Sequence, residues 1–229
     1  MSANSESGVP RAREETTVRD VLTSDADLSS VLIEGPAMVG KQAIAVDLLA
    51  TANRAGGQPI AVTTADTVEQ LRTVYREAGG EDTDRLAVVD CLPGDGGTEN
   101  EWTRSVGSPG DLTGIAMAVS KVFESISEQR RDGARLLIDN VAPSLMYTNI
   151  EPMYRFLHAL IGRVTESGGA VIATLDTDGI EDSEYRALAG LFDTIVEVRQ
   201  SDGTTEFRLT GREDGPDGWH QHASGGVDA

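Results

Sequence analysis

A loop that could hold phosphates stands near the start of the chain, in the residues Gly35-Pro36-Ala37-Met38-Val39-Gly40-Lys41-Gln42. It fits the pattern G-x-x-x-x-G-K, in which glycines let the backbone wrap around an anion and successive N–H groups at a helix start supply partial positive charge. Lys41 would bring a full charge to the β- and γ-phosphates, and it is one of only two lysines in the chain. We predict that residues 35–42 bind ATP or ADP. A glycine-rich turn without a ligand is the alternative.

Magnesium chemistry depends on two further positions. A P-loop enzyme carries Ser or Thr directly after the lysine, and its hydroxyl ligates Mg²⁺. This chain has Gln42 there, whose carbonyl oxygen could reach a cation but not at the same place, because the side chain is longer. Asp139 ends an apolar run, as the Asp of a Walker B segment does, and it could hold Mg²⁺ through water. We expect Asp139 to be the metal-side residue, and Mg²⁺ binding itself stays open.

Short apolar runs that alternate with helical patterns must position these residues. Residues 31–34 predict a strand in front of the loop, and residues 42–55 predict a helix behind it. Further strands are expected at 60–64, 86–92, 136–139 and 170–175, and further helices at 67–78, 112–130, 151–167 and 184–191. Residues 194–199 and 205–210 alternate apolar and polar positions around a Ser-Asp-Gly turn, which indicates a hairpin.

Nearly continuous apolar strands separated by helices indicate parallel strands that are buried on both faces. The predicted fold is therefore α/β, a three-layer α/β/α sandwich with a mostly parallel sheet and a C-terminal β-hairpin. We expect the fourth strand to lie beside the first. The domain is predicted to span residues 28–212, with a flexible N-terminal segment at 1–27 and a disordered acidic tail at 213–229.

The order of P-loop, strands, Walker B segment and terminal hairpin resembles the RecA superfamily, and within it the archaeal KaiC-like and RadA-like branch. The resemblance covers about residues 28–212. The stretch Ser108-Pro109-Gly110-Asp111-Leu112-Thr113-Gly114 and the acidic composition are similar to KaiC-like paralogues of haloarchaea. The resemblance implies a RecA-like sheet, an ATP site that is commonly shared between subunits, and homo-oligomers or a protein partner.

The same resemblance implies a catalytic Glu after the second strand, where it polarises the attacking water. The matching positions here are Ala65 and Asp66. Asp is one methylene shorter than Glu, and a base displaced by about 1 Å can lose on the order of 10²-fold in rate. We therefore consider Asp66 a weak candidate base, with a helix N-cap as its alternative role.

RecA-like recombinases hold DNA with loops after the fourth and fifth strands, and the residues found there make nucleic acid an unsuitable partner. The connections 140–150 and 176–183 contain neither Lys nor Arg, and acidic residues crowd the second. The long connection 93–110 carries Trp102, which suits either a partner contact or packing onto the domain. Candidates to reach a neighbouring subunit's nucleotide are Arg104, Arg199 and Arg208.

The composition limits partners and location. The chain has 229 residues, with 19 Lys and Arg against 38 Asp and Glu, and its net charge of −19 argues against binding to nucleic acid or to an anionic membrane. The acidity is typical of a salt-adapted surface, and an acidic docking face is the alternative. No apolar run reaches the ~20 residues that cross a bilayer, and residues 1–20 do not resemble a signal peptide. We therefore expect a cytoplasmic protein. The single Cys91 excludes an intrachain disulfide and multi-Cys zinc sites.

Three functions fit these observations. We favour a KaiC/RecA-like ATP-binding regulatory protein with a degenerate catalytic set, which hydrolyses ATP weakly or not at all and signals through its nucleotide state or oligomerisation. The alternatives are an active RecA-like ATPase, with Asp66 as base and Asp139 on the metal, and a nucleotide-free protein-interaction scaffold. Gln42 and Ala65 favour the first function over the second, and the retained Lys41 argues against the third.

Overall fold

The computed structural model describes residues 16–22, 29–54, 56–92, 94, 100–210 and 218–223 of the chain. In this part of the chain one sheet has nine strands. Their order across the sheet is β4 (Thr103–Ser105), β3 (Ala87–Asp90), β2 (Pro59–Thr63), β5 (Arg135–Asp139), β6 (Ala170–Asp176), β1 (Ser30–Gly35), β7 (Thr194–Ser201), β8 (Thr204–Thr210) and β9 (His220–Gln221). Every neighbouring pair from β4 to β7 is parallel, whereas β7 with β8 and β8 with β9 are antiparallel. The predicted mostly parallel sheet with a C-terminal hairpin is confirmed.

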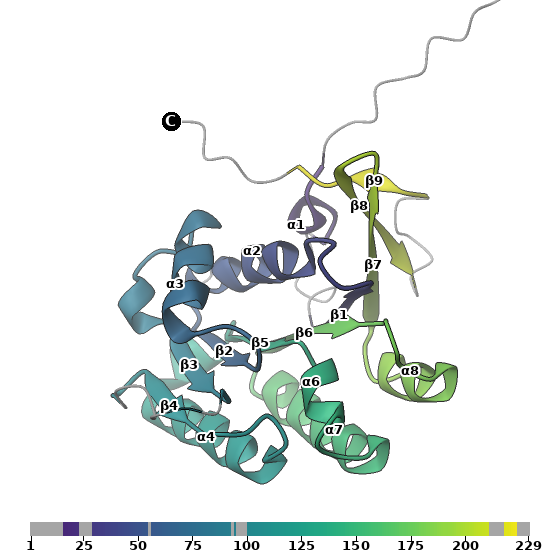
Figure 1. The fold of residues 1–229 in the computed structure, drawn as a ribbon. Coiled ribbons are helices and arrows are strands. Elements are labelled where there is room, and N and C mark those ends of the chain that lie inside the picture. Colours follow the sequence, from purple (N-terminus) through teal and green to yellow (C-terminus); the bar gives the residue numbers. More distant parts are fainter. Residues whose placement is uncertain are drawn as a thin grey trace, which may run out of the picture.

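Helices cover both faces of the sheet (Figure 1). One face carries α1 (Val18–Val21), α2 (Lys41–Arg54) and α3 (Val68–Glu77), and the other carries α4 (Leu112–Ser125), α7 (Ile150–Glu166) and α8 (Asp182–Ala189). The shorter helical turns are η2 (Thr83–Arg85), α5 (Glu128–Arg131) and α6 (Ala142–Leu145). This is the predicted three-layer α/β/α sandwich. Among the described helices, none has the length and apolar character needed to cross a membrane.

The central strand β1 illustrates why these strands are apolar at nearly every position. All of its residues are buried. Val31 and Ile33 pack in the hydrophobic cluster that contains α2, and Leu32 packs in the cluster that contains α4 and α7. A strand between two helical layers has no face in water, so the alternation of apolar and polar residues disappears.

The position of β5 differs from the expectation that it lies beside β1. β5 pairs with β2 on one side and with β6 on the other, and β6 separates it from β1. The spatial order of parallel strands depends on where each crossover helix returns the chain to the sheet, which the order of elements along the sequence does not fix. Asp139 at the end of β5 therefore lies beside Thr63 of β2 instead of beside the strand that enters the loop.

The helix predicted over residues 112–130 is interrupted. α4 ends at Ser125, Ile126 adopts an extended conformation with φ −96° and ψ 150°, and α5 begins at Glu128. Ile126 is only 5% exposed. β-Branched residues favour the extended conformation. The break lets Ile126 adopt this conformation and bury its side chain.

The connection 93–110, predicted to be irregular, contains the edge strand β4. Val88, Val89 and Asp90 of β3 pair with it in parallel. The strand reads Thr-Arg-Ser and has no apolar residue, so no hydrophobic pattern in the sequence indicates it. Residues 93 and 95–99 of this connection lie outside the described residues.

Both end segments contain a stretch that packs on the domain, unlike the predicted flexible segment 1–27 and disordered tail 213–229. The helix α1 is buried through Val18, which packs in the same cluster as α2. β9 extends the hairpin beyond β8. The N–H of Ala223 donates to the carbonyl of Thr16 at 3.1 Å, which joins the two stretches. The rest of both segments lies outside the described residues.

Candidate functional site

The loop between β1 and α2 adopts a backbone conformation that depends on its glycines. Gly35 has φ +148°, and a Cβ at this position would meet the carbonyl oxygen of Val198 at 2.1 Å, so only glycine fits. Gly40 has φ +93°. Between them Met38 has φ +64°, and its side chain is 94% exposed. Left-handed residues among ordinary ones turn successive N–H groups toward one side, an arrangement that binds anions.

The backbone N–H groups in the middle of this loop are unpaired. Within the described residues, Met38, Val39 and Gly40 have no hydrogen-bond acceptor for their N–H groups. The helix α2 begins directly after them and has no acidic residue in its first turn. The partial positive charge of the helix N-terminus is therefore not neutralised by a carboxylate of α2 itself.

Lys41 points back onto its own loop. Its Nζ donates to the carbonyl oxygens of Gly35, at 2.9 Å, and of Pro36, and it forms an ion pair with Oδ1 of Asp176 at 2.7 Å. The lysine is only 6% exposed. Its charge is thus held at the base of the loop by one carboxylate and two carbonyl groups, where it adjoins the unpaired N–H groups.

Gln42 joins two carboxylates. Its Nε2 donates to Oδ2 of Asp139 at 2.6 Å and also to Oδ2 of Asp66. The second oxygen of Asp139, Oδ1, accepts from the hydroxyl of Thr174 at 3.2 Å. The two hydrogens of one amide group therefore occupy the space between the Walker B carboxylate and the candidate base.

The charge of Asp139 is strongly affected by its surroundings. Burial raises the pKa of this carboxyl above its ordinary value, because water no longer solvates the charged form. The hydrogen bonds from Gln42 and Thr174 lower the pKa, whereas the nearby carboxylates Asp66 and Asp176 raise it further. The protonation of Asp139 consequently depends on which side chain stands at position 42.

The carboxyl ends of four strands bring these residues together. Gly35 ends β1, Asp139 ends β5, Asp176 ends β6, and Asp66 follows β2. The register places Gly35 beside Asp176 and Asp139 beside Thr63. This edge of a doubly wound sheet is where ligands bind.

Two adjoining cavities lie at this edge. The first has a volume of about 470 Å³ and is lined by loop residues together with Ala65, Asp66, Asp139 and Asp176. The second, of about 420 Å³, is lined by residues of α6 and α8 and shares Ala37, Asn140 and Asp176 with the first. Either volume lies in the range of ~300–1,000 Å³ that small-molecule sites occupy.

A model of a protein family of unknown function, DUF7504, matches residues 29–198, which include the loop and the carboxylates around it. The chain belongs to the DUF7504 family. No curated protein matches its sequence. Among solved structures, this DUF7504 protein is similar to a KaiC-like protein from the hyperthermophilic archaeon Pyrococcus horikoshii OT3, with a TM-score of 0.59 and 17% identity over 85% of this chain and 84% of that chain. The likeness establishes a KaiC-like, RecA-type fold.

The residues of this DUF7504 protein do not fit Mg²⁺ in the ordinary P-loop manner. Mg²⁺ takes oxygen ligands in near-octahedral geometry. Between Asp66 and Asp139 the structure has the N–H groups of Gln42, which are hydrogen-bond donors and cannot ligate a cation. Within the described residues, no group of three or more His, Cys, Asp or Glu could hold a metal ion. We therefore assign no chemical step to Mg²⁺.

The structure places the remaining sequence-predicted residues as follows. Asp66 lies in the site and is not the N-cap of α3, because Thr67 caps that helix in a capping box with Gln70. Trp102 packs against the hydrophobic cluster that contains α4 and α7, which agrees with the domain-packing alternative. The two hairpin arginines are engaged within the DUF7504 chain: Arg199 pairs with Glu206, Arg208 pairs with Glu197, and both lie over the ring of Trp219.

Two site residues were not predicted as such. From the sequence, Asp176 and Asp178 are expected only to repel DNA, yet both bind the loop directly. Oδ2 of Asp178 accepts from the N–H of Ala37 at 2.9 Å, and Asp176 pairs with Lys41. The available signal is their place at the end of the fifth predicted strand, because parallel strands bring their carboxyl ends to one edge.

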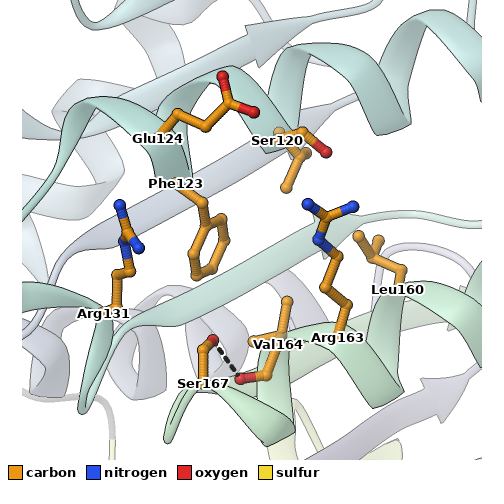
Figure 2. A pocket seen from close by; sticks show the side chains of 9 residues that line it. Ser120, Phe123, Glu124, Arg131, Leu160, Arg163, Val164 and Ser167 are labelled. Atoms are coloured by element: carbon orange, nitrogen blue, oxygen red, sulfur yellow. Dashed lines mark hydrogen bonds between the residues drawn. The ribbon is translucent and has the colours of Figure 1, made fainter. Parts of the chain in front are cut away.

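A third cavity lies away from the loop, between α4, α5 and α7. It has a volume of about 150 Å³. Figure 2 shows Arg131 and Arg163 on either side of Phe123, with Glu124 above them. Its lining comes from the segments that precede β5 and β6, so it lies at the opposite edge of the sheet from the P-loop. It contains none of the residues predicted to carry chemistry.

Proposed function

We propose that this protein binds ATP or ADP through residues 35–42 and acts as an ATP-binding regulatory protein. The observation that carries the proposal is the row of N–H groups at Met38, Val39 and Gly40, which have no acceptor in the described part of the chain. This row adjoins Lys41 and borders a cavity large enough for a nucleotide. Unpaired backbone N–H groups at a helix start, beside a lysine, are a site for phosphate. The RecA-type fold is consistent with this ligand.

Weak or absent hydrolysis is the second part of the proposal. Gln42 supplies no hydroxyl for Mg²⁺ and ties the candidate base Asp66 to Asp139. Ala65, the other position that matches the catalytic Glu of the RecA superfamily, has no side chain that could accept a proton. The bound nucleotide would therefore act by its presence, and the cytoplasmic protein would pass on its nucleotide state to a homo-oligomer or to a protein partner.

The first prediction tests the loop. Lys41→Ala should weaken ATP and ADP binding at least tenfold, about 1.4 kcal/mol, because the only full positive charge placed at the loop by the motif is lost. The measurement is isothermal titration calorimetry in molar KCl, with and without Mg²⁺. The matched control is Lys121→Ala, which removes the other lysine, an exposed residue of α4. Circular dichroism should establish that both variants are folded.

Three results would separate the candidate functions. Equal affinity in the wild type and Lys41→Ala would contradict the assignment of the loop. A wild-type protein that binds neither nucleotide would favour the protein-interaction scaffold. Brisk ATP turnover that disappears in Asp66→Ala would favour the active ATPase.

A further inference from the structure

The connection from β6 to α8 runs along the phosphate-binding loop. Asp176 pairs with Gly35 in the sheet register, and the N–H of Thr177 donates to the carbonyl of Gly35 at 3.0 Å. Two carboxylates of this connection then bond to positive groups of the loop. Asp176 pairs with Nζ of Lys41 at 2.7 Å, and Asp178 accepts from the N–H of Ala37 at 2.9 Å.

These carboxylates hold the groups that a nucleotide phosphate would use. An anion that enters the loop needs the charge of Lys41 and the backbone N–H groups, and two internal anions are already bonded to part of that set. A phosphate bonded to the same groups would lie close to these carboxylates. Like charges that lie close together repel strongly where water is partly excluded. Phosphate binding therefore requires that at least one of the two carboxylates moves away.

The two carboxylates differ in how firmly they are held. Asp176 ends a strand and also accepts, through Oδ2, from Nδ2 of Asn140 at 2.8 Å. Asp178 is exposed, and among the described residues the hydrogen bond from Ala37 is the one polar contact that holds it. It is followed by Gly179, whose φ of +81° allows a backbone turn that other residues rarely adopt. Asp178 is thus the carboxylate that can leave.

We propose that Asp178 is an internal competitor of the nucleotide phosphates, so that nucleotide binding is coupled to displacement of the β6–α8 connection. This inference rests on the proposed function and adds the regulation of the same site. The displaced connection would change the second cavity, because Asp178, Gly179 and Ile180 line it together with Met146 of the α6 region. Met146 is 84% exposed, so a change in this cavity would alter a surface that a partner could contact.

The test compares a substitution in the β6–α8 connection with one at the first residue of α8. Asp178→Ala removes the competing carboxylate and should tighten ADP binding about three- to tenfold, because hydrogen bonds to charged groups are among the stronger ones but this one is exposed. Asp182→Ala removes the same charge from a side chain that is 94% exposed and paired with Arg186 at 3.7 Å, and should leave the affinity unchanged. Both variants change the net charge equally, so a general charge effect cancels. Calorimetry with ADP in Mg²⁺-free molar KCl gives the affinities.

Each outcome has a definite meaning. Tighter binding in Asp178→Ala alone supports the competitor, and so does ADP binding by Asp178→Ala when the wild type binds none. Equal or weaker affinity in a folded Asp178→Ala, beside a wild type that binds ADP, overturns the competitor and leaves the proposed function intact. If the wild type and both variants all fail to bind ADP, the proposed function is itself wrong and the competitor is wrong with it.

Discussion

Gln42 determines what the site can do with a divalent cation. Its amide places two N–H donors between Asp66 and Asp139, where two carboxylates alone would repel each other and attract a metal. The amide therefore satisfies both carboxylates without any ion. The same hydrogen bond lowers the pKa of Asp139 against the effect of its burial, which raises it. One substitution at this position thus changes both the cation preference and the charge of the site.

The prediction at residue scale concerns this position. Gln42→Thr should tighten Mg·ATP binding about threefold or more, because threonine supplies a hydroxyl and removes the amide from between the carboxylates. ATP hydrolysis should stay below about 1 s⁻¹, because Ala65 still stands at a position that matches the catalytic Glu of the RecA superfamily, which the sequence resembles. Calorimetry and a phosphate-release assay measure the two effects. Gln129→Thr, an exposed change on α5, is the control, and a restored turnover would contradict the prediction.

Among the elements, the buried strands were predictable from the sequence, whereas their order in the sheet and the edge strand β4 were not. The apolar runs indicated β1, β2, β3, β5 and β6 because each is buried on both faces. The position of β6 between β1 and β5 follows from crossovers that no local pattern records. The edge strand β4 has no apolar residue, and its place depends on pairing with β3.

In the candidate site, too, some residues could be predicted from the sequence and some contacts could not. The loop 35–42 and Asp139 follow from motifs, because phosphate binding requires particular residue types at fixed spacing. The contacts of Asp178 with Ala37 and of Gln42 with Asp66 join residues that are far apart in the sequence. They exist because four strand ends meet at one edge, so only the three-dimensional order of the strands reveals them.

The prediction at element scale concerns the contact between β1 and α8. Glu34 of β1 is 7% exposed, and burial raises its pKa, while a hydrogen bond with Tyr185 of α8 lowers it. When the pKa of a carboxyl is higher in the folded than in the unfolded state, the group stabilises the fold most at a pH below its pKa in the unfolded state. This contribution is lost as the pH rises through the pKa in the folded state. The contribution of Glu34 to stability should therefore fall as the pH rises above about 4.5, the ordinary pKa of this group.

Glu34→Gln should remove this dependence. We expect the free energy of unfolding to increase at pH 7, because the amide stays neutral where the buried carboxylate is charged, and to be unchanged at pH 4. Denaturant unfolding at the two pH values measures it. Glu77→Gln, an exposed change at the end of α3, should have no effect at either pH. A loss of stability at pH 7 would mean that the charged carboxylate supports the fold.

At the scale of the whole molecule, the net charge of −19 opposes self-association. Salt shortens the Debye length to about 3 Å at 1 M and so relieves the repulsion. The hairpin arginines are paired within the chain, whereas Arg104 is partly exposed on the edge strand β4 and forms no ion pair with the described residues. Arg104 is therefore the arginine we retain as a contact to a neighbouring subunit or partner.

We predict a monomer in dilute salt and nucleotide-promoted oligomers in molar KCl. Light scattering with saturating ATP, at low and high salt, measures the mass. Arg104→Ala should reduce the oligomers, and Arg76→Ala, an exposed arginine of α3, should not. A monomer under every condition would leave a partner protein as the way to transmit the bound state.

The hydrogen bond between Ala223 and Thr16 has a consequence for how the molecule opens. It ties α1, which covers α2, to β9, which extends the hairpin next to the loop. Both stretches are short, so we expect the hydrogen bond between them to support each one in addition to its own contacts with α2 or β8. They form one cooperative unit made from opposite ends of the chain. A local unfolding event that begins at either end therefore releases both, and the covering of α2 and the outer edge of the hairpin are lost in the same step.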